Sequence, residues 1–127
     1  MGKNLKGKTL GVLGLSFKPN TDDLRDAPSI KIINMLGEKG AKIRAFDPVA
    51  MPRASKLLKN VVYCKNSEET AKDADALLIV TEWNEFGQLN LGRIKKLMKR
   101  PIIFDGRNIY NPQEVRKLGF IYKGIGR

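Results

Sequence analysis

The sequence contains no histidine and a single cysteine, Cys64. Without histidine, the chain lacks the commonest general acid or base near neutral pH, and it cannot form a Ser-His or Cys-His catalytic triad. The usual histidine-containing ligand sets for transition metals are excluded as well, so we expect no metal site. A lone cysteine also excludes a disulfide within the chain.

Long apolar runs are missing too. No segment approaches the roughly 18 apolar residues needed to cross a bilayer. The basic start of the chain, residues 1–8, lacks the apolar stretch of a signal peptide. We therefore expect a cytoplasmic protein with no membrane partner. A length of 127 residues with 42% hydrophobic residues suits one globular domain, so residues 1–127 are interpreted as a single domain.

Charge of one sign dominates the composition. The chain has 24 Lys and Arg against 13 Asp and Glu, a formal net charge of +11. This excess indicates an anionic partner, which could be nucleic acid, a membrane surface or a phosphorylated small molecule. The basic run at residues 93–100 fits the solvated face of an amphipathic helix. It has no interleaved aromatic residues, so nucleic-acid binding is not favoured there.

Apolar strand patterns alternate with helical patterns along the chain. Strands are predicted over residues 9–15, 42–46, 61–64, 76–81, 102–105 and 120–125. Helices are predicted from Pro28 to a stop at Gly40, over residues 52–58, 68–74 and 91–99, and from Pro112, after the capping Asn111, to a stop at Gly119. Near-continuous apolar strands between helices imply an α/β fold with a doubly wound, mostly parallel Rossmann-like sheet in three αβα layers.

In such a sheet, ligands bind beyond the carboxyl ends of the strands, where the strand order switches. With the usual strand order, the first and fourth strands flank that switch. The loops of interest are therefore residues 16–27, 82–86 and 106–110.

The loop after the first strand lacks the dinucleotide-binding signature. Gly11 and Gly14 are present, but G-x-G-x-x-G is not, so the primary NAD site is not expected here. The loop instead offers Lys18 and Arg25, whose side chains can pair with phosphate oxygens. A plain polar surface loop is the alternative interpretation.

The motif D-G-R-N at residues 105–108 follows the fifth strand, and its glycine permits a tight turn. Arg107 is then expected to project over the same crevice as Lys18. An arginine in this place can make a two-pronged contact with a phosphate or a sugar. The alternative is an ion pair with one of the aspartates at positions 22, 23 and 105.

Two further features have structural and functional interpretations. Trp83 and Phe86 lie three positions apart, which favours packing of a short helix on the core over stacking on a base or sugar. Cys64 has no histidine to activate it, so a structural thiol is favoured over a nucleophile.

Several blocks together resemble one known family. The sequence GVLGLSFKPNTDDLRDAPS spans residues 11–29, AFDP spans 45–48, ADALLIVTEWNEF spans 74–86 and IFDGRN spans 103–108; GFIY and IGR near the end fit too. The chain is similar in order, over almost its whole length, to the C-terminal UDP-binding domain of the UDP-glucose/GDP-mannose dehydrogenase family. Within that family it looks nearest to the UDP-glucose 6-dehydrogenases.

The resemblance implies a function. Enzymes of this family oxidise the primary alcohol of a nucleotide sugar to a carboxylate in two NAD-dependent steps, through a cysteine thioester. The positions of Phe17, Lys18 and Arg107 match residues that contact the UDP-sugar, and Arg25 matches an arginine that reaches towards NAD. The resemblance further implies conversion of UDP-glucose to UDP-glucuronate for polysaccharide biosynthesis, and a homodimer in which N-terminal and central domains hold most of the NAD and the catalytic cysteine.

Two departures from the family pattern matter. The G-G-S-C-type nucleophile motif and the N-terminal Rossmann glycines are absent, so the chain is expected to contain no catalytic residue and to be inactive by itself. It would be a fragment of the enzyme or one partner of a split enzyme. The alternatives are a UDP-N-acetylmannosamine or GDP-mannose dehydrogenase domain, a stand-alone NAD-binding regulator, and a basic nucleic-acid-binding module.

Overall fold

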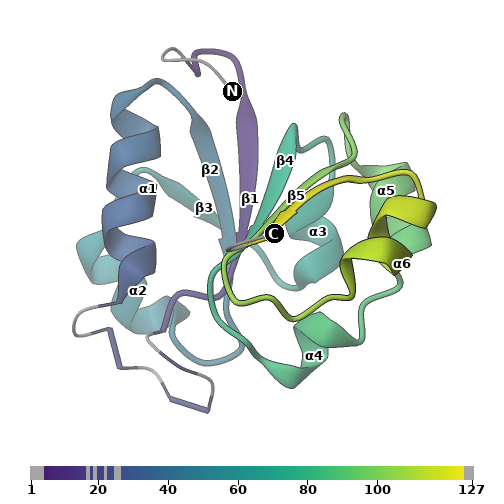
Figure 1. Cartoon of the computed structure of the whole chain (residues 1–127). Helices are drawn as coiled ribbons and strands as arrows, with labels where there is room; N and C mark the ends of the chain where they lie inside the picture. Colours follow the sequence, from purple (N-terminus) through teal and green to yellow (C-terminus); the bar gives the residue numbers. More distant parts are fainter. Residues whose placement is uncertain (1–4, 17, 19, 22, 25–26, 125–127) are drawn as a thin grey trace.

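The computed structural model describes residues 5–16, 18, 20, 21, 23, 24 and 27–124. Six parallel strands form one sheet in the order β3-β2-β1-β4-β5-β6 (Figure 1). The strands are β1 (Thr9–Leu13), β2 (Lys42–Phe46), β3 (Val61–Tyr63), β4 (Ala76–Ile79), β5 (Ile102–Asp105) and β6 (Ile121–Gly124). The helices are α1 (Pro28–Glu38), α2 (Met51–Leu57), α3 (Ser67–Ala71), α4 (Asn84–Gly87), α5 (Leu91–Leu97) and α6 (Pro112–Lys117).

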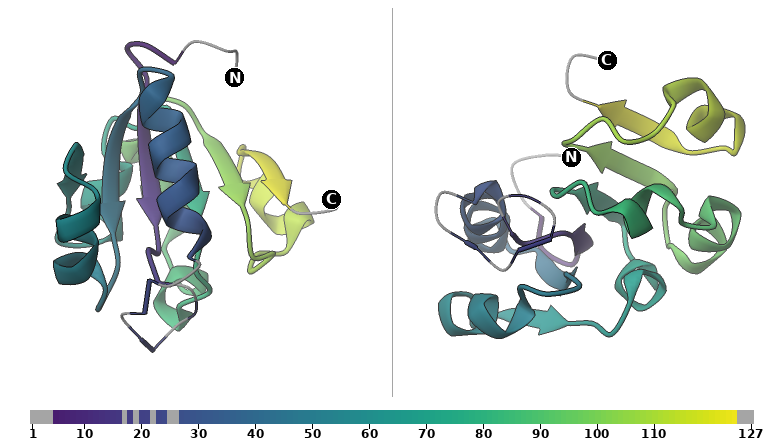
Figure 2. Two further views of the ribbon diagram at one scale, coloured as in Figure 1. Left: turned by 90° about the vertical axis from the view of Figure 1, so that its left-hand side faces the viewer. Right: turned by 90° about the horizontal axis from the view of Figure 1, so that it is seen from below.

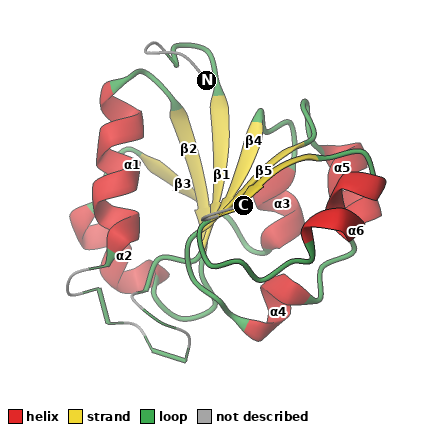
Figure 3. Cartoon of the chain, viewed as in Figure 1, coloured by secondary structure: helices red, strands yellow, loops and turns green. Residues whose placement is uncertain are grey.

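The helices lie on both faces of the sheet, which confirms the predicted doubly wound α/β architecture. Helices α1 and α2 lie on one face, and α3 to α6 lie on the other (Figures 1 and 3). Each face has its own apolar core. The first contains buried Leu10, Val12 and Ile33, and the second contains buried Leu77, Phe86 and Ile103, among others. The near-continuous apolar strands follow from burial on both sides.

The predicted end of the first strand is wrong. We expected a strand over residues 9–15, but β1 ends at Leu13 because Gly14 takes a φ of 98°. The next two backbone N–H groups, of Leu15 and Ser16, donate to the side chain of Asp47 instead of continuing the ladder. The fourth strand likewise ends at Ile79, two positions before the predicted Thr81.

Other boundaries moved for local reasons. Helix α3 begins at Ser67 because the Asn66 side chain caps it by accepting from the Glu69 N–H at 2.8 Å. It ends at Ala71, earlier than predicted, and Asp73 then takes a φ of 58°. The predicted cap at Asn111 is confirmed, since its side chain accepts from the N–H groups at positions 113 and 114. Smaller shifts affect β3, β6, α1, α2 and α5.

The described residues contain neither a membrane-spanning helix nor a cluster of metal ligands. No helix in that part of the chain has the length and apolar character to cross a bilayer. No cluster of three or more His, Cys, Asp or Glu side chains there is suited to hold a metal ion.

Candidate functional site at the carboxyl edge of the sheet

The switch in strand order lies between β1 and β4, as predicted, and the chain closes tightly there. A Cβ atom at Gly14 would lie 2.5 Å from Thr81 Oγ1, so only glycine fits without a shift. The Thr81 hydroxyl donates to the Ser16 carbonyl at 2.7 Å. In a dinucleotide-binding domain this turn leaves room for a pyrophosphate. Here Thr81 packs directly against the turn at Gly14.

Asp47 directly follows β2 and is fully buried. Its carboxylate connects two loops at this edge. Its Oδ2 atom accepts from the Leu15 N–H at 2.8 Å and from the Ser16 N–H at 3.2 Å. The same oxygen lies 3.2 Å from Nε1 of Trp83, which donates to it. One carboxylate oxygen thus contacts both the loop after β1 and the loop after β4.

The position of Asp47 bears on the NAD alternative. In a Rossmann domain, an acidic residue that follows the glycine-rich turn by about 20 positions binds the cofactor ribose. Asp47 ends the corresponding strand, but it is buried and occupied by protein donors. The primary NAD site therefore does not fit at this edge, which speaks against a stand-alone NAD-binding regulator.

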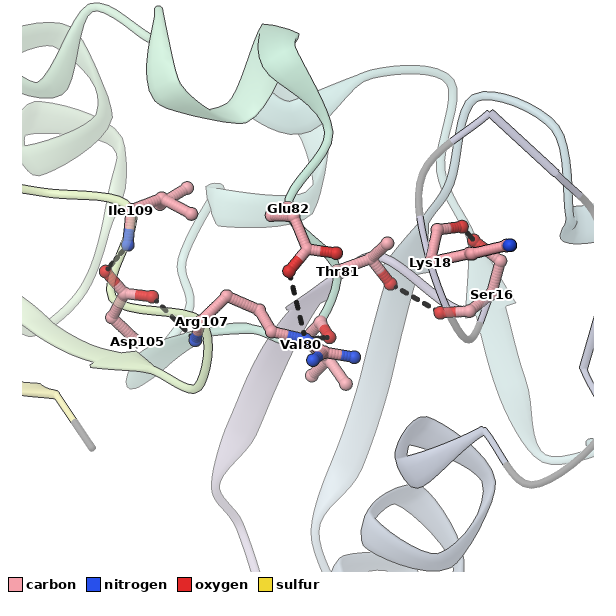
Figure 4. Close-up of polar contacts among 8 residues, drawn as sticks. All are labelled: Ser16, Lys18, Val80, Thr81, Glu82, Asp105, Arg107 and Ile109. Atoms are coloured by element: carbon pink, nitrogen blue, oxygen red, sulfur yellow. Dashed lines mark hydrogen bonds and ion pairs between the residues drawn. The ribbon is translucent and has the colours of Figure 1, made fainter. Parts of the chain in front are cut away.

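Lys18 lies on the loop after β1, and its side chain is exposed. Its backbone carbonyl accepts from the Ser16 hydroxyl at 2.8 Å, so the loop is held next to the end of β1 (Figure 4). The other two loop residues singled out from the sequence, Phe17 and Arg25, lie outside the described residues.

The loop after β5 is organised by a second buried aspartate, Asp105, which is 1% exposed. Its carboxylate accepts from the backbone N–H groups of Arg107 at 3.0 Å and Ile109 at 2.8 Å. The hydroxyl of Tyr122, on β6, donates to it at 2.7 Å. These contacts set the direction in which Arg107 leaves the sheet.

The side chain of Arg107 reaches across to the loop after β4. Its Nε donates to the Val80 carbonyl at 2.9 Å and lies 3.7 Å from a Glu82 carboxylate oxygen (Figure 4). The sequence analysis considered only aspartates as ion-pair partners of Arg107, so its pairing with Glu82 was not predicted. Both side chains of the pair are partly exposed, at 28% and 40%.

The two cations lie at the same edge but are not in contact. In Figure 4, Lys18 and Arg107 flank the residues at the end of β4, and the Lys18 ammonium points away from Arg107. The residues Thr81 and Glu82, in the loop after β4, lie between them in this view. A bound anion that contacts both cations would have to span this loop.

The packing interpretations of the two aromatic residues agree with the structure. Phe86 is fully buried and meets Phe46 edge to face, with ring centroids 6.2 Å apart. Trp83 is only 9% exposed. Cys64 is buried as well, and this burial raises the pKa of its thiol above the usual 9.0, which suits a structural residue.

Sequence reasoning assigned no role at this edge to Asp47 or Thr81, and it placed Glu82 in a loop of this edge without pairing it with Arg107. A signal was present, because Asp47 directly follows one apolar strand and Asp105 is the last residue of another, at the edge where ligands bind. The pairing of Glu82 with Arg107 left no such signal, since it depends on how two loops face each other.

Comparison with known proteins places this geometry in a family. The sequence profile of the UDP-glucose/GDP-mannose dehydrogenase family, UDP binding domain, matches residues 11–112. The chain belongs to this family. It is 47% identical over 126 residues to a UDP-glucose 6-dehydrogenase of Rhizobium meliloti, covering 99% of the chain and 29% of the relative. It is 46% identical over 125 residues to UDP-glucose 6-dehydrogenase TuaD of Bacillus subtilis, covering 98% and 27%.

Solved structures agree with this assignment. A UDP-glucose dehydrogenase from Pyrobaculum islandicum superposes with a TM-score of 0.79 at 30% identity, covering 96% of this chain and 26% of that one. A UDP-D-ManNAc dehydrogenase from Pyrococcus horikoshii gives 0.77 at 34% identity, covering 98% and 27%. The UDP binding domain described here thus spans less than a third of the length of these relatives.

Proposed function

We propose that residues 1–127 form the UDP-sugar-binding domain of a UDP-glucose 6-dehydrogenase, an enzyme that oxidises UDP-glucose to UDP-glucuronate with two NAD. The observation that carries the proposal is the shared position of two loops. The loop with Lys18 and the loop with Arg107 both lie at the carboxyl edge of the sheet, on either side of the end of β4. The names of the most similar relatives supply the substrate.

The charges of these side chains suit a nucleoside diphosphate. Arginine and lysine form strong, charge-assisted hydrogen bonds with phosphate oxygens. Arg107 is aimed by the Val80 carbonyl and Glu82, so less side-chain entropy is lost when it meets a ligand. The resemblance adds Phe17 as an apolar contact to the UDP-sugar and Arg25 as a contact towards NAD.

The chemistry itself belongs to the rest of the enzyme. Cys64 is buried and its thiol has a raised pKa, so it does not serve as the nucleophile of the thioester. NAD is held mainly by an N-terminal domain, because the loop after β1 lacks the glycine-rich signature that binds a pyrophosphate and Asp47 is occupied by protein donors. Closure of this domain over the substrate would keep water from the reactive intermediate. The full enzyme is a cytoplasmic homodimer of polysaccharide biosynthesis in this proposal, and the isolated chain is inactive.

The test is an NMR titration of the 127-residue chain with UDP-glucose, GDP-mannose and NAD in separate samples. UDP-glucose should shift the amide signals around Lys18 and Arg107. Lys18→Ala should abolish those shifts by removing a phosphate contact. Lys96→Ala is the matched control, because Lys96 is an exposed lysine on α5. Shifts caused by NAD alone, with none from UDP-glucose, would contradict the proposal.

One observation favours a second sugar. The Pyrococcus horikoshii UDP-D-ManNAc dehydrogenase is 34% identical to the chain, against 30% for the Pyrobaculum islandicum UDP-glucose dehydrogenase. UDP-N-acetylmannosamine therefore belongs in the same titration. Tighter binding of this sugar than of UDP-glucose would change the proposed substrate to UDP-N-acetylmannosamine and leave the family unchanged.

A further inference from the structure

Asp47 forms hydrogen bonds both within its own turn and with distant segments at this edge. Its Oδ1 atom accepts from the backbone N–H groups of Val49 and Ala50, both at 2.8 Å. These two contacts form the local turn that leads into α2. Its Oδ2 atom serves a different purpose, because its donors come from segments 31 to 36 positions away in the sequence.

The segments joined by Oδ2 are those next to the two proposed ligand-binding cations. On one side, Ser16 donates through its backbone N–H to Asp47, and its hydroxyl donates to the Lys18 carbonyl. On the other side, Trp83 donates to Asp47 and directly follows Glu82, which lies against Arg107. A short series of contacts therefore runs from Lys18 through Asp47 to Arg107.

We propose that Asp47 is a positioning residue of the UDP-sugar site. Its carboxylate holds the loop after β1 and the loop after β4 at a fixed spacing, so that Lys18 and Arg107 stay at a fixed separation, across which a UDP-sugar that spans the loop after β4 contacts both. This inference rests on the proposed function, because a spacing between two cations matters only if one ligand contacts both.

The role can be tested by exchanging one carboxylate oxygen of Asp47 for an NH₂ group. All the hydrogen-bond partners of Asp47 among the described residues are donors, so each oxygen must accept. An asparagine offers one oxygen, and its NH₂ group must face donors on the other side. The donors at positions 49 and 50 are fixed by the short turn. The NH₂ group of Asp47→Asn should therefore face Leu15, Ser16 and Trp83 and push those loops apart.

The experiment uses the 127-residue chain with Asp47→Asn and a matched variant, Asp75→Asn. Asp75 is also a buried aspartate, 3% exposed, that accepts a backbone N–H, from Thr9 at 2.9 Å. Asp75 lies at the opposite edge of the sheet, immediately before β4. Both variants should lose stability in urea, whereas only Asp47→Asn should alter the ligand edge.

Two readouts separate positioning from a purely structural role. Without ligand, Asp47→Asn should move the amide signals of residues 15–16, 80–83 and 107 and the indole N–H signal of Trp83, the single tryptophan of the chain. With UDP-glucose, its affinity should fall about tenfold or more, the scale expected when a charge-assisted hydrogen bond is lost. Asp75→Asn should show neither effect.

Trp83→Phe provides a second route if Asp47→Asn does not fold. It keeps the carboxylate but removes the indole donor together with part of a ring system that packs in the core, and it should weaken UDP-glucose binding and shift the signal of Arg107. A folded Asp47→Asn chain with wild-type affinity, or with shifts confined to residues 47–50, would overturn the positioning role. A wild-type chain that ignores UDP-glucose would overturn the proposed function first, and this role with it.

Discussion

Asp47 and Asp105 end the second and fifth strands, and each is buried with its carboxylate surrounded by hydrogen-bond donors. A buried charge is costly unless several donors satisfy it. For Asp105, backbone N–H groups of the following loop supply most of the donors, whereas Asp47 accepts from its own turn and from the loops after β1 and β4, so these loops must adopt one conformation for each charge to be tolerated. Single residues thereby determine the direction of the loops that carry the candidate site.

Tyr110 shows how burial at this edge makes stability depend on pH. Its hydroxyl donates to the Phe86 carbonyl. Burial, then the charge of Asp105 and the neighbouring Tyr122, raise the pKa of Tyr110 well above its usual 10.0. The folded state therefore keeps the proton more tightly than the unfolded chain, and this contribution is complete below the unfolded pKa.

We predict that the free energy of unfolding falls as the pH rises above about 10, where the unfolded tyrosine ionises and the folded one does not. The measurement is the urea midpoint between neutral pH and strongly alkaline pH. The urea midpoint of Tyr110→Phe should be lower at neutral pH, because a hydrogen bond is lost. It should fall less steeply than that of the wild-type chain as the pH rises. Parallel declines for the two proteins would show that Tyr110 does not cause the effect. Tyr63, whose pKa is also raised by burial, is present in both.

At the scale of helices and strands, the existence and order of the elements could be predicted from the sequence, but several of their ends could not. Apolar periodicity is local, and so is a cap such as Asn111, which binds N–H groups two and three positions away. The end of β1 depends on Asp47, 32 positions from Leu15. No local pattern contains that contact.

The same distinction explains the candidate site. The motifs with Lys18 and Arg107 could be assigned to the carboxyl edge because each follows a strand, and all the strands of a parallel sheet end at the same edge. Their separation by the loop after β4 could not be predicted, because it depends on tertiary contacts such as that between Thr81 and Ser16. Positions 17 and 25 stay predictions.

The close approach of β1 and β4 leads to a prediction about Gly14. Replacement by alanine would introduce a Cβ atom 2.5 Å from Thr81 at a backbone φ of 98°. We expect Gly14→Ala to lower the free energy of unfolding by about 2 kcal/mol or more, through backbone strain and overpacking together.

Gly37→Ala is the matched control for this change. Gly37 lies within α1, and a Cβ atom there would meet nothing within 4 Å. Alanine in a helix should raise the free energy of unfolding by about 0.5–1 kcal/mol. Urea denaturation of both variants tests the pair. A small effect at Gly14 would mean that the ends of β1 and β4 can separate readily.

For the molecule as a whole, the helices cover the sheet unevenly. Helices α1 and α2 pack beside β1 to β3, and the same face of β4 to β6 carries no helix among the described residues (Figure 2). Two neighbouring cavities of about 440 and 330 Å³ open there, and both are lined by Ile32, Leu78 and Phe104. Ile121, on β6, pairs with Ile102 next to this face and is 66% exposed.

An apolar sheet face without a covering layer should bind a hydrophobic dye such as ANS. We predict that Ile121→Lys lowers the ANS fluorescence of the folded chain, because it places a charge beside this face. Its stability should change by less than about 0.5 kcal/mol, since the side chain is mostly exposed already. Val62→Lys is the control: Val62 is 60% exposed but lies on β3, at the other end of the sheet. Equal losses of fluorescence in both variants would mean that the dye binds to general surface apolarity and not to the uncovered face.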